Sequence, residues 1–151
     1  MEKSVAIITA RGGSRRIPRK NIKPFLGRPI LEYSVEAALQ AALFDEVMVS
    51  TDDREIAQAA ERAGAVVPFF RSGDTADDFA TTADVVEEVL ASYERMGRHF
   101  RTACCIYPTA PFVTAETLRT AMALLEQERA DCVIPVVKFS FPPQRGVVVR
   151  E

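Results

Sequence analysis

The sequence lacks the marks of several common protein classes. Its three cysteines, Cys104, Cys105 and Cys132, have no CxxC or Cys/His spacing, so we expect reduced thiols in the core and no metal or redox centre. No apolar run approaches the roughly 20 residues that cross a bilayer, and the N-terminus has no signal-peptide pattern. We therefore expect a cytoplasmic protein that does not enter a membrane. Neither a G-x-x-x-x-G-K-S/T nor a G-x-G-x-x-G loop occurs, which argues against two common nucleotide-binding folds.

Basic charge is scarce outside one short segment. Six of the 19 basic residues lie between positions 11 and 23, where no acidic residue occurs, whereas elsewhere 13 basic residues stand against 21 acidic ones. A protein that binds nucleic acid carries a more widespread basic surface. One cationic segment on an acidic body instead attracts a small anion. The charge pattern predicts a small phosphorylated ligand and no nucleic-acid partner.

Apolar and helical patterns alternate along the 151 residues. Strands are predicted near 4–10, 46–50, 66–70, 103–107 and 132–137, and helices near 29–42, 53–63, 80–96 and 114–129. The alternation predicts a single α/β domain, a doubly wound and mainly parallel sheet with helices on both faces. Pro29 suits a first helical turn, and Gly64 suits the end of a helix. Because ligands of such sheets bind beyond the carboxyl ends of the strands, the site residues are expected there.

The basic segment directly follows the first predicted strand. Gly12 and Gly13 allow positive φ angles, so successive backbone N–H groups can form an anion-binding nest. Arg11, Arg15 and Lys20 add full positive charges. An exposed basic turn is the alternative, but six cations in thirteen residues repel one another unless an anion lies among them. The segment therefore predicts a polyphosphate site.

The order of residues in this segment is also specific. Positions 10–21 read ARGGSRRIPRKN and resemble the A-R-x-G-S-K-x-(L/I/V)-x-x-K-N signature of acylneuraminate cytidylyltransferases. The similarity extends along essentially the whole chain, and segments 44–53, 77–84 and 106–112 look like those of members that act on pseudaminic acid. The resemblance implies a nucleotide-diphospho-sugar transferase fold, which is similar to the Rossmann fold. It also implies transfer of CMP from CTP to the anomeric hydroxyl of a nine-carbon acidic sugar, with release of pyrophosphate.

By this resemblance the basic segment holds the nucleotide. Arg11 and Lys20 would neutralise the triphosphate, and Asn21 would orient the nucleotide beside the α-phosphorus. Phosphate oxygens would be bound by three small residues, Gly12, Gly13 and Ser14. Arg15 stands where the family usually has lysine, so it offers a planar fork in place of a point charge. The neighbouring cations of the segment, Arg19 among them, can equally be solvated.

Residues after the third predicted strand are expected to bind the nucleoside. The resemblance assigns Arg71 to the nucleotide and gives cytosine and ribose contacts to Ala80, Thr81 and Thr82. Small groups at these positions would let backbone donors and acceptors read the edge of cytosine, whereas a purine would overfill the site. Either threonine can also cap the helix that begins there. Both roles are compatible.

Fewer residues are candidates for the acceptor sugar. Tyr107 stands where many sialic acid relatives have glutamine, and in this it resembles the pseudaminic acid branch, although packing is an equal alternative. Gln144 and Arg145 are candidates for the sugar carboxylate, for which the guanidinium of Arg145 is the better partner, and Lys138 is a weaker one. His99 lies at a predicted helix end, where a surface role is expected.

The resemblance implies a Mg²⁺ ion held by an Asp-x-Asp pair far downstream, and this sequence has no corresponding pair. Asp52 and Asp53 follow a predicted strand, but Asp52 with Glu55 has the spacing of a helix cap, which we prefer to a metal site. A strand-like alternation begins at Arg145 and stops at position 151. We expect part of a longer polypeptide, without its C-terminal portion and the family's dimerisation segment. Such a chain would bind CTP with little turnover, and its full-length form would be a homodimer.

Three alternatives stay open. The first is a nucleotidyltransferase for another acidic sugar, such as N-acetylneuraminic, legionaminic or keto-deoxy octonic acid. The second is a nucleotide-binding module without catalysis, supported by the missing carboxylate pair. In the third, an interaction domain uses its basic segment to bind an acidic protein, and nucleotides have no effect on its stability.

Overall fold

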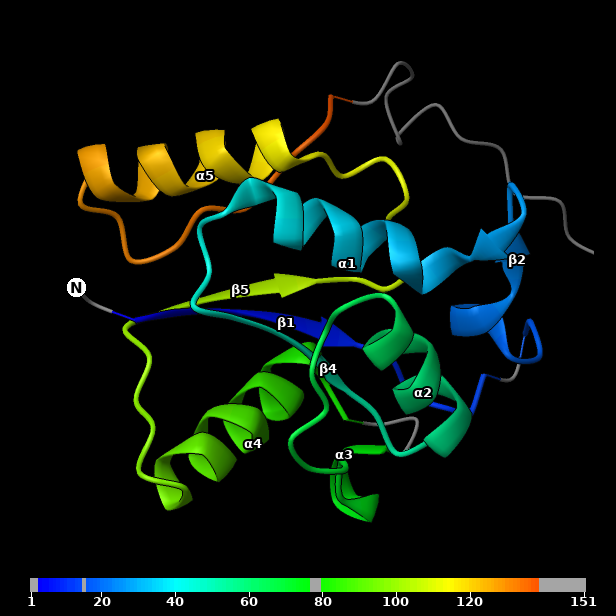
Figure 1. Ribbon diagram of the computed structural model, residues 1–151. Helices are drawn as coiled ribbons and strands as arrows, with labels where there is room; N and C mark the ends of the chain where they lie inside the picture. The colour runs from blue at the N-terminus through cyan, green and yellow to red at the C-terminus, as the bar shows by residue number, and fades with distance from the viewer. Residues whose placement is uncertain (1–2, 15, 77–79, 139–151) are drawn as a thin grey trace, which may run out of the picture. The chain divides into compact units, whose positions relative to one another are not determined.

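The computed structural model describes residues 3–14, 16–76 and 80–138, and its central element is a parallel sheet (Figure 1). Strands β1 (Ser4–Thr9), β4 (Glu46–Ser50) and β5 (Thr102–Ile106) lie in the order β4-β1-β5. In the register, Ile7 pairs with Met48 on one side and with Cys105 on the other. β1 is buried along nearly its whole length, as expected of a parallel strand that is covered on both faces.

Four longer helices form close to their predicted positions: α1 (Ile30–Ala41), α2 (Arg54–Arg62), α4 (Thr82–Arg95) and α5 (Ala115–Gln127). α1 and α4 cover opposite faces of the sheet (Figure 1). α2 lies on the same face as α1, and its buried Ile56, Ala59 and Ala60 belong to the same core cluster as the buried apolar residues of α1. The expected α/β class, with a parallel sheet and helices on both faces, is confirmed.

The chain divides into two compact units, Met1–Thr120 and Ala121–Glu151. The sheet and all helices up to α4 belong to the first unit, and the boundary falls inside α5. Within the first unit, Leu118 of α5 is buried in the core, and Arg119 donates to the carbonyl oxygen of Gln40 at the end of α1. No helix in the described residues is long and apolar enough to cross a bilayer.

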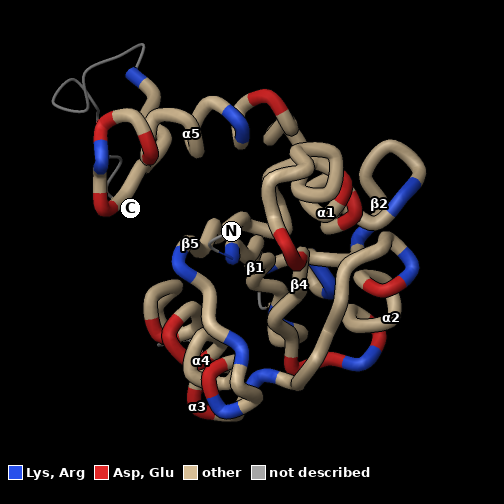
Figure 2. Tube along the Cα trace, turned by 60° about the vertical axis from the view of Figure 1, so that its left-hand side comes forward, with Lys and Arg blue, Asp and Glu red and all other residues tan. Residues whose placement is uncertain are grey.

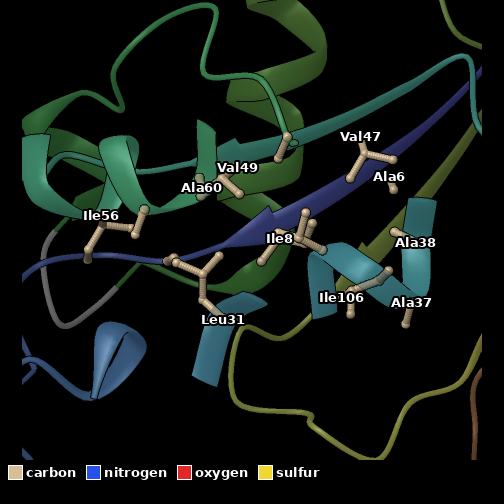
Figure 3. Close-up of a cluster of buried hydrophobic side chains, with 14 of the residues drawn as sticks. Ala6, Ile8, Leu31, Ala37, Ala38, Val47, Val49, Ile56, Ala60 and Ile106 are labelled. Atoms are coloured by element: carbon tan, nitrogen blue, oxygen red, sulfur yellow. The ribbon is translucent and has the colours of Figure 1, made fainter. Parts of the chain in front are cut away.

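The core lies on both faces of the sheet because successive side chains of a strand point in opposite directions. On one face, Ile8, Val49, Leu31 and Ile56 point toward one another (Figure 3). On the other face, a second cluster forms around Tyr93 of α4. The two clusters fix the sheet between its helices and leave the carboxyl ends of the strands open for a site.

Two predicted strands are wrong. Residues 66–70 form only an isolated parallel bridge, between Val66 and Met48, because Pro68 has no N–H group with which to continue the ladder. Residues 132–137 have no regular structure, and Ile134 and Val136 are exposed. A strand requires a neighbour to pair with its backbone, and among the described residues this segment has none.

Several short elements were not predicted. Strands β2 (Pro24–Phe25) and β3 (Arg28–Pro29) form a small antiparallel ribbon. Its turn residues, Leu26 and Gly27, have φ angles of 47° and 88°, as a two-residue turn of this kind requires. The 3-10 helix η1 (Lys20–Ile22) and the short α3 (Gly73–Ala76) add two further turns.

The helix-end predictions fared differently. Gly64 ends α2 as predicted: its φ is 96°, its N–H donates to the carbonyl of Glu61, and the N–H of Ala65 donates to that of Ala60. Pro29 was predicted in the first turn of the helix, but it lies one position before α1, at the N-cap.

The cysteines are free thiols, as predicted, but they are not core residues. Cys105 and Cys132 are exposed, and only the partly buried Cys104 packs against a core cluster. Burial alternates along β5, and Cys105 is one of its exposed residues, whereas Cys104 and Ile106 belong to or contact a core cluster. Burial raises the pKa of Cys104 to about 11, so this thiol stays protonated near neutral pH.

Candidate functional site

A polar cavity of about 220 Å³ lies at the carboxyl ends of β1 and β5, where a parallel sheet is expected to bind its ligand. Its lining residues all belong to the first unit. They are Thr9, Arg11, Lys20, Asn21, Arg71, Thr75, Ala80, Thr81, Thr82, Val85, Tyr107, Pro108 and Thr109. The charged members of this set are three cations, and no aspartate or glutamate belongs to it among the residues that the structure describes. The cavity is therefore suited to an anion.

Arg71 carries the most deeply buried charge of the site, with a side chain that is only 9% exposed. Its Nε and Nη2 donate to the hydroxyl and the carbonyl oxygen of Ser50, at 3.0 and 2.8 Å. Burial holds the pKa of Arg71 below its ordinary value, and the negative charges of Asp52 and Glu88 oppose this shift. In the described chain no carboxylate forms an ion pair with this guanidinium. An anionic ligand would therefore compensate a buried charge.

Asn21 provides the complementary chemistry, a buried acceptor. Its side chain is 4% exposed, and Nδ2 donates to the carbonyl oxygen of Arg11 at 2.8 Å. Because that carbonyl can only accept, this contact fixes which way the amide points. Oδ1 is buried and has no hydrogen-bond partner in the described residues. Phosphate oxygens cannot satisfy Oδ1, so it is suited to a hydroxyl or amino group of a ligand.

The start of the basic segment contacts the N-terminus of α2. The N–H of Gly12 donates to Oδ1 of Asp52 at 2.7 Å, and a Cβ atom at position 12 would lie 2.8 Å from Oδ2 of Asp53. Neither Gly12 nor Gly13 has a positive φ angle, so the predicted nest geometry is wrong. Glycine is required at position 12 because a carboxylate approaches it closely.

The predicted cap of α2 is displaced by one residue. Asp53 caps the helix by accepting from the N–H groups of Glu55 and Ile56, at 2.9 and 3.0 Å. Asp52, which the sequence pattern favoured as the cap, instead accepts a hydrogen bond from the N–H of Gly12. The spacing between Asp52 and Glu55 fitted a capping box, but only the backbone path after the strand decides which carboxylate faces the helix.

The end of the basic segment is held by the same helix. Arg19 donates with both terminal nitrogens to the carboxylate of Asp53, with Nη2 at 3.0 Å from Oδ1, and also contacts Glu55. Arg19 has a φ of 53°, so it adopts the left-handed conformation. It does not belong to the cavity lining, unlike its neighbours Lys20 and Asn21.

Two threonines and a tyrosine form another part of the cavity wall. Thr81 caps α4 in a reciprocal arrangement with Asp84, which confirms that a threonine caps this helix. Thr82 is not the cap, and its hydroxyl lies 3.1 Å from the hydroxyl of Tyr107. The backbone of Tyr107 is fixed by the buried Ser34, whose hydroxyl donates to its carbonyl oxygen at 2.9 Å. The tyrosine is thus tied to α1 and to α4 at once.

The cavity brings together most of the predicted site. Eight predicted residues line it: Arg11, Lys20, Asn21, Arg71, Ala80, Thr81, Thr82 and Tyr107. Gly12, Gly13 and Ser14 do not line it, although the N–H of Ser14 donates to the carbonyl of Gly12 at 2.9 Å and tightens the loop. Arg15, Gln144 and Arg145 lie outside the described residues, so their predicted roles remain predictions.

Sequence reasoning missed five lining residues: Thr9, Thr75, Val85, Pro108 and Thr109. Thr9 is the last residue of β1, and Pro108 and Thr109 follow β5, so their position at strand ends was a usable signal. Thr75 lies on α3, which the sequence did not predict, and donates to the carboxylate of Glu88. His99 is exposed, in agreement with its predicted surface role.

The residues present do not make a Mg²⁺ site by themselves. No group of three or more histidine, cysteine or acidic side chains is arranged around a metal position in the described parts of the chain. Asp52 already accepts from Gly12, and Asp53 accepts from Arg19 and from the first turn of α2. Both carboxylates are therefore used in holding the loop, and no chemical step is assigned to a metal.

A parallel α/β sheet with a cationic cavity at its carboxyl edge is typical of α/β proteins that bind an anionic ligand at the ends of their strands. The sequence is more specific than the fold: residues 5–142 match the family model described as "Cytidylyltransferase". The chain belongs to the cytidylyltransferase family.

Individual relatives share this assignment. The chain is 39% identical over 149 residues to the pseudaminic acid cytidylyltransferase of Campylobacter jejuni, covering 99% of the chain and 64% of the relative. It is 35% identical over 139 residues to the CMP-N,N'-diacetyllegionaminic acid synthase of Legionella pneumophila, covering 92% and 60%. The chain thus spans less than two thirds of the length of these relatives.

Solved structures agree with the fold. A CMP:2-keto-3-deoxy-manno-octonic acid synthetase complexed with CTP superposes with a TM-score of 0.71 at 26% identity, covering 85% of this chain and 49% of that one. A 4-diphosphocytidyl-2C-methyl-D-erythritol synthase from Anaerococcus prevotii superposes with a TM-score of 0.60 at 18% identity, covering 83% and 52%, which shows a shared fold alone.

Proposed function

We propose that this protein transfers CMP from CTP to the anomeric hydroxyl of a nine-carbon acidic sugar, with pseudaminic acid as the preferred acceptor. The family match and the two relatives named after CMP transfer to acidic sugars support the reaction. The relative that favours pseudaminic acid is matched over nearly all of the present chain. The same chemistry with legionaminic acid is the second candidate, favoured by the Legionella relative.

One observation carries the proposal: Arg71 is a buried cation whose guanidinium is held by Ser50 at the edge of a cavity that Arg11 and Lys20 also line. A buried charge that no carboxylate of the described residues pairs with directly is costly, and the phosphates of CTP would offset that cost. Three cations in so small a space favour a compact ligand with several negative charges, such as a triphosphate. The cavity is therefore proposed to hold the nucleotide.

The other wall suits the nucleoside. Ala80 and Thr81 place small side chains and backbone beside the cavity, so a pyrimidine can approach the main chain closely. The unpartnered Oδ1 of Asn21 would accept a hydrogen bond from a ribose hydroxyl or from the amino group of cytosine. These groups together favour a cytidine nucleotide, as the family assignment does.

The residues of the chain act by alignment and by stabilising charge. When the sugar hydroxyl attacks the α-phosphorus, the bond to the pyrophosphate oxygen breaks and negative charge builds up on that leaving group. Arg11 and Lys20 would bind that charge, while Asn21 and Arg71 keep the nucleotide fixed. Tyr107, which is tied to Ser34 and Thr82, would contact the acceptor sugar, with Gln144 and Arg145 proposed for its carboxylate.

Other parts of the proposal depend on the family resemblance. They are a Mg²⁺ ion, for which the described residues form no group of carboxylate ligands, assembly of the full-length protein as a homodimer, and a location in the cytoplasm. Each is a proposal about the whole protein, of which the chain spans less than two thirds when compared with its relatives.

Nucleotide protection tests the proposal. Isothermal titration and thermal unfolding are measured with CTP, UTP, ATP and GTP, and CTP is expected to bind and to raise the unfolding temperature most. Pyrophosphate release is then measured with CTP, Mg²⁺ and pseudaminic, legionaminic or N-acetylneuraminic acid. A preference for a purine nucleotide would contradict the proposed site. This chain is itself expected to show little turnover, so the same assay is run on a longer polypeptide that includes a downstream Asp-x-Asp pair. If that polypeptide binds CTP but releases no pyrophosphate with any of the three sugars, the result would support the alternative of a non-catalytic nucleotide module.

A further inference from the structure

The basic segment is held from outside the cavity by acidic residues. Asp52, Asp53 and Glu55, at the start of α2, contact both ends of the segment: Asp52 accepts from the N–H of Gly12, and the other two pair with Arg19. Figure 2 shows both acidic and basic positions along the chain at α2. We call these three carboxylates the acidic clasp. They explain how a loop rich in cations can fold before an anion arrives.

The side chain of Arg19 contacts acidic residues of α2 and its N-cap and not the cavity. It does not line the cavity, whereas Lys20 and Asn21, the next two residues, do. Its guanidinium is half-buried and points to the carboxylate of Asp53, with which it makes two hydrogen bonds. The contact with Arg19 is the main cause that holds the pKa of Asp53 below its ordinary value. Both partners are thus charged at neutral pH.

The backbone of the loop depends on this contact. Arg19 has a φ of 53°, a conformation that costs free energy in a residue with a side chain and persists where its surroundings enforce it. Its carbonyl oxygen accepts from the N–H of Ile22, so the turn at Arg19 begins η1 and sets the direction of Lys20 and Asn21. At the other end, Gly12 lies so close to Asp53 that a Cβ atom would collide with it.

We propose that Arg19 is a positioning residue, which through the acidic clasp holds Lys20 and Asn21 in the geometry that binds the nucleotide, and that it is not itself a phosphate ligand. The inference rests on the proposed function, since it concerns the affinity for CTP. It assigns a role to three carboxylates that would otherwise lower the affinity for an anion by repulsion.

The sign of one charge effect separates the two roles of Arg19. Asp53→Asn removes a negative charge near the loop and keeps an acceptor that can cap α2. If Arg19 bound phosphate, this variant would bind CTP more tightly, because repulsion falls and the guanidinium is released. If Arg19 is a positioning residue, Asp53→Asn weakens CTP binding although the protein becomes more positive. Glu61→Gln, which neutralises an exposed carboxylate at the far end of α2, is the matched control.

The experiment measures CTP affinity by titration calorimetry and the amide exchange of residues 12–22 without ligand. Asp53→Asn and Arg19→Gln are each expected to weaken CTP binding roughly fivefold, the effect of a partly exposed ion pair. The double variant is expected to be no weaker than either single one, because both act through one contact. Arg19→Lys is expected to recover part of the affinity, and Glu61→Gln to leave it unchanged. Amide exchange in the loop is expected to be faster in Asp53→Asn and Arg19→Gln.

The outcomes separate this inference from the proposed function. Unchanged or tighter CTP binding by Asp53→Asn overturns the positioning role, and additive losses in the double variant do the same. Should Asp53→Asn fail to fold, Glu55→Gln gives the same comparison, since Glu55 contacts Arg19 without capping the helix. If the unmodified chain binds no CTP, the proposed function fails. The clasp is then judged by amide exchange alone, and unchanged exchange in its variants overturns it.

Discussion

Polar side chains that are buried at the cavity decide its chemistry. Arg71 brings a positive charge without a carboxylate partner in the described residues, and Asn21 brings an acceptor without a donor. A cytidine nucleotide offers both complements, because its phosphates accept and its ribose and base donate.

Arg71→Gln is expected to weaken CTP binding about thirtyfold or more, because truncating one side of a buried charge contact costs roughly 2 kcal/mol or more. Lysine cannot replace it, since a single ammonium does not reproduce the two contacts with Ser50. Titration calorimetry provides the measurement. Arg62→Gln, an exposed change on α2, is the control. An Arg71→Gln affinity within twofold of the unmodified protein would be incompatible with the proposed site.

Asn21→Asp is expected to lower the free energy of unfolding by about 2 kcal/mol, because the variant loses the donor to the carbonyl of Arg11 and leaves two acceptors facing each other in a buried place. It is also expected to weaken CTP binding at least tenfold, because it adds a negative charge beside the phosphates. Urea unfolding and calorimetry measure the two effects. Unchanged stability would show that the contact with Arg11 contributes nothing.

Single residues could be predicted where a strand ends and poorly where a loop folds back. Arg71 and Tyr107 were predicted from the family resemblance, and both stand at or just after the end of a predicted strand, where the cavity lies. The exchange of roles between Asp52 and Asp53 could not be found, because both carboxylates fit the cap pattern and the path of the backbone decides between them. The contact of Arg19 with Asp53 joins positions 34 residues apart, which no local pattern reveals.

At the scale of elements, α4 begins at the cavity wall, and the two threonines at its start, Thr81 and Thr82, have different roles. Thr81→Ala is expected to lower the free energy of unfolding by about 1 kcal/mol, because its hydroxyl caps α4. Thr82→Ala removes only the contact with Tyr107 and is expected to change stability by less than about half of that. Thermal or urea unfolding compares the pair, and Thr81→Ser is the control that keeps the cap. Equal losses for both alanine variants would refute the division of roles.

The longer elements were predictable because they bury one regular stripe. β1, β4, β5 and the four long helices follow hydrophobic periodicity, and Gly64 ends α2 as its pattern indicates. Short elements such as the β2–β3 ribbon and α3 have too few residues to show any period. The two incorrect strands had the right composition, but a ladder needs a partner and an N–H group at every step.

At the scale of the whole molecule, one network ties the sheet to α4 on the face opposite α1. Buried Tyr93 donates to Glu46 of β4, Arg98 donates to the same carboxylate at 2.6 Å, and Phe69 and Phe100 pack edge-on against the tyrosine ring. Burial, followed by the contact with Glu46, raises the pKa of Tyr93 above its ordinary value. This network makes the stability of the fold depend on pH in the alkaline range.

Tyr93→Phe is expected to lower the free energy of unfolding by about 1 kcal/mol at pH 7 to 9, through loss of one hydrogen bond. Since the folded pKa is raised, the stability from the protonated phenol is complete below the ordinary pKa of 10.0 and is lost as pH rises above it. The unmodified protein therefore loses up to about 1.4 kcal/mol per pH unit above pH 10 that the variant does not lose. Urea unfolding from pH 7 to 11 should show the gap closing. A constant gap would refute this role for Tyr93.

The incomplete strand after α2 has a consequence for the site. Val66 pairs regularly with β4. If the same register continued, the N–H of Phe70 would donate to the carbonyl oxygen of Thr51. Instead the N–H of Arg71 donates to that oxygen, at an N–O distance of 2.8 Å. The chain has slipped by one residue beside Pro68, and a slip of one residue exchanges the two faces of a strand. Phe70 is 52% exposed as a result, while the guanidinium of Arg71 is turned inward. A single proline thus directs a charge, in place of an aromatic ring, to the mouth of the cavity.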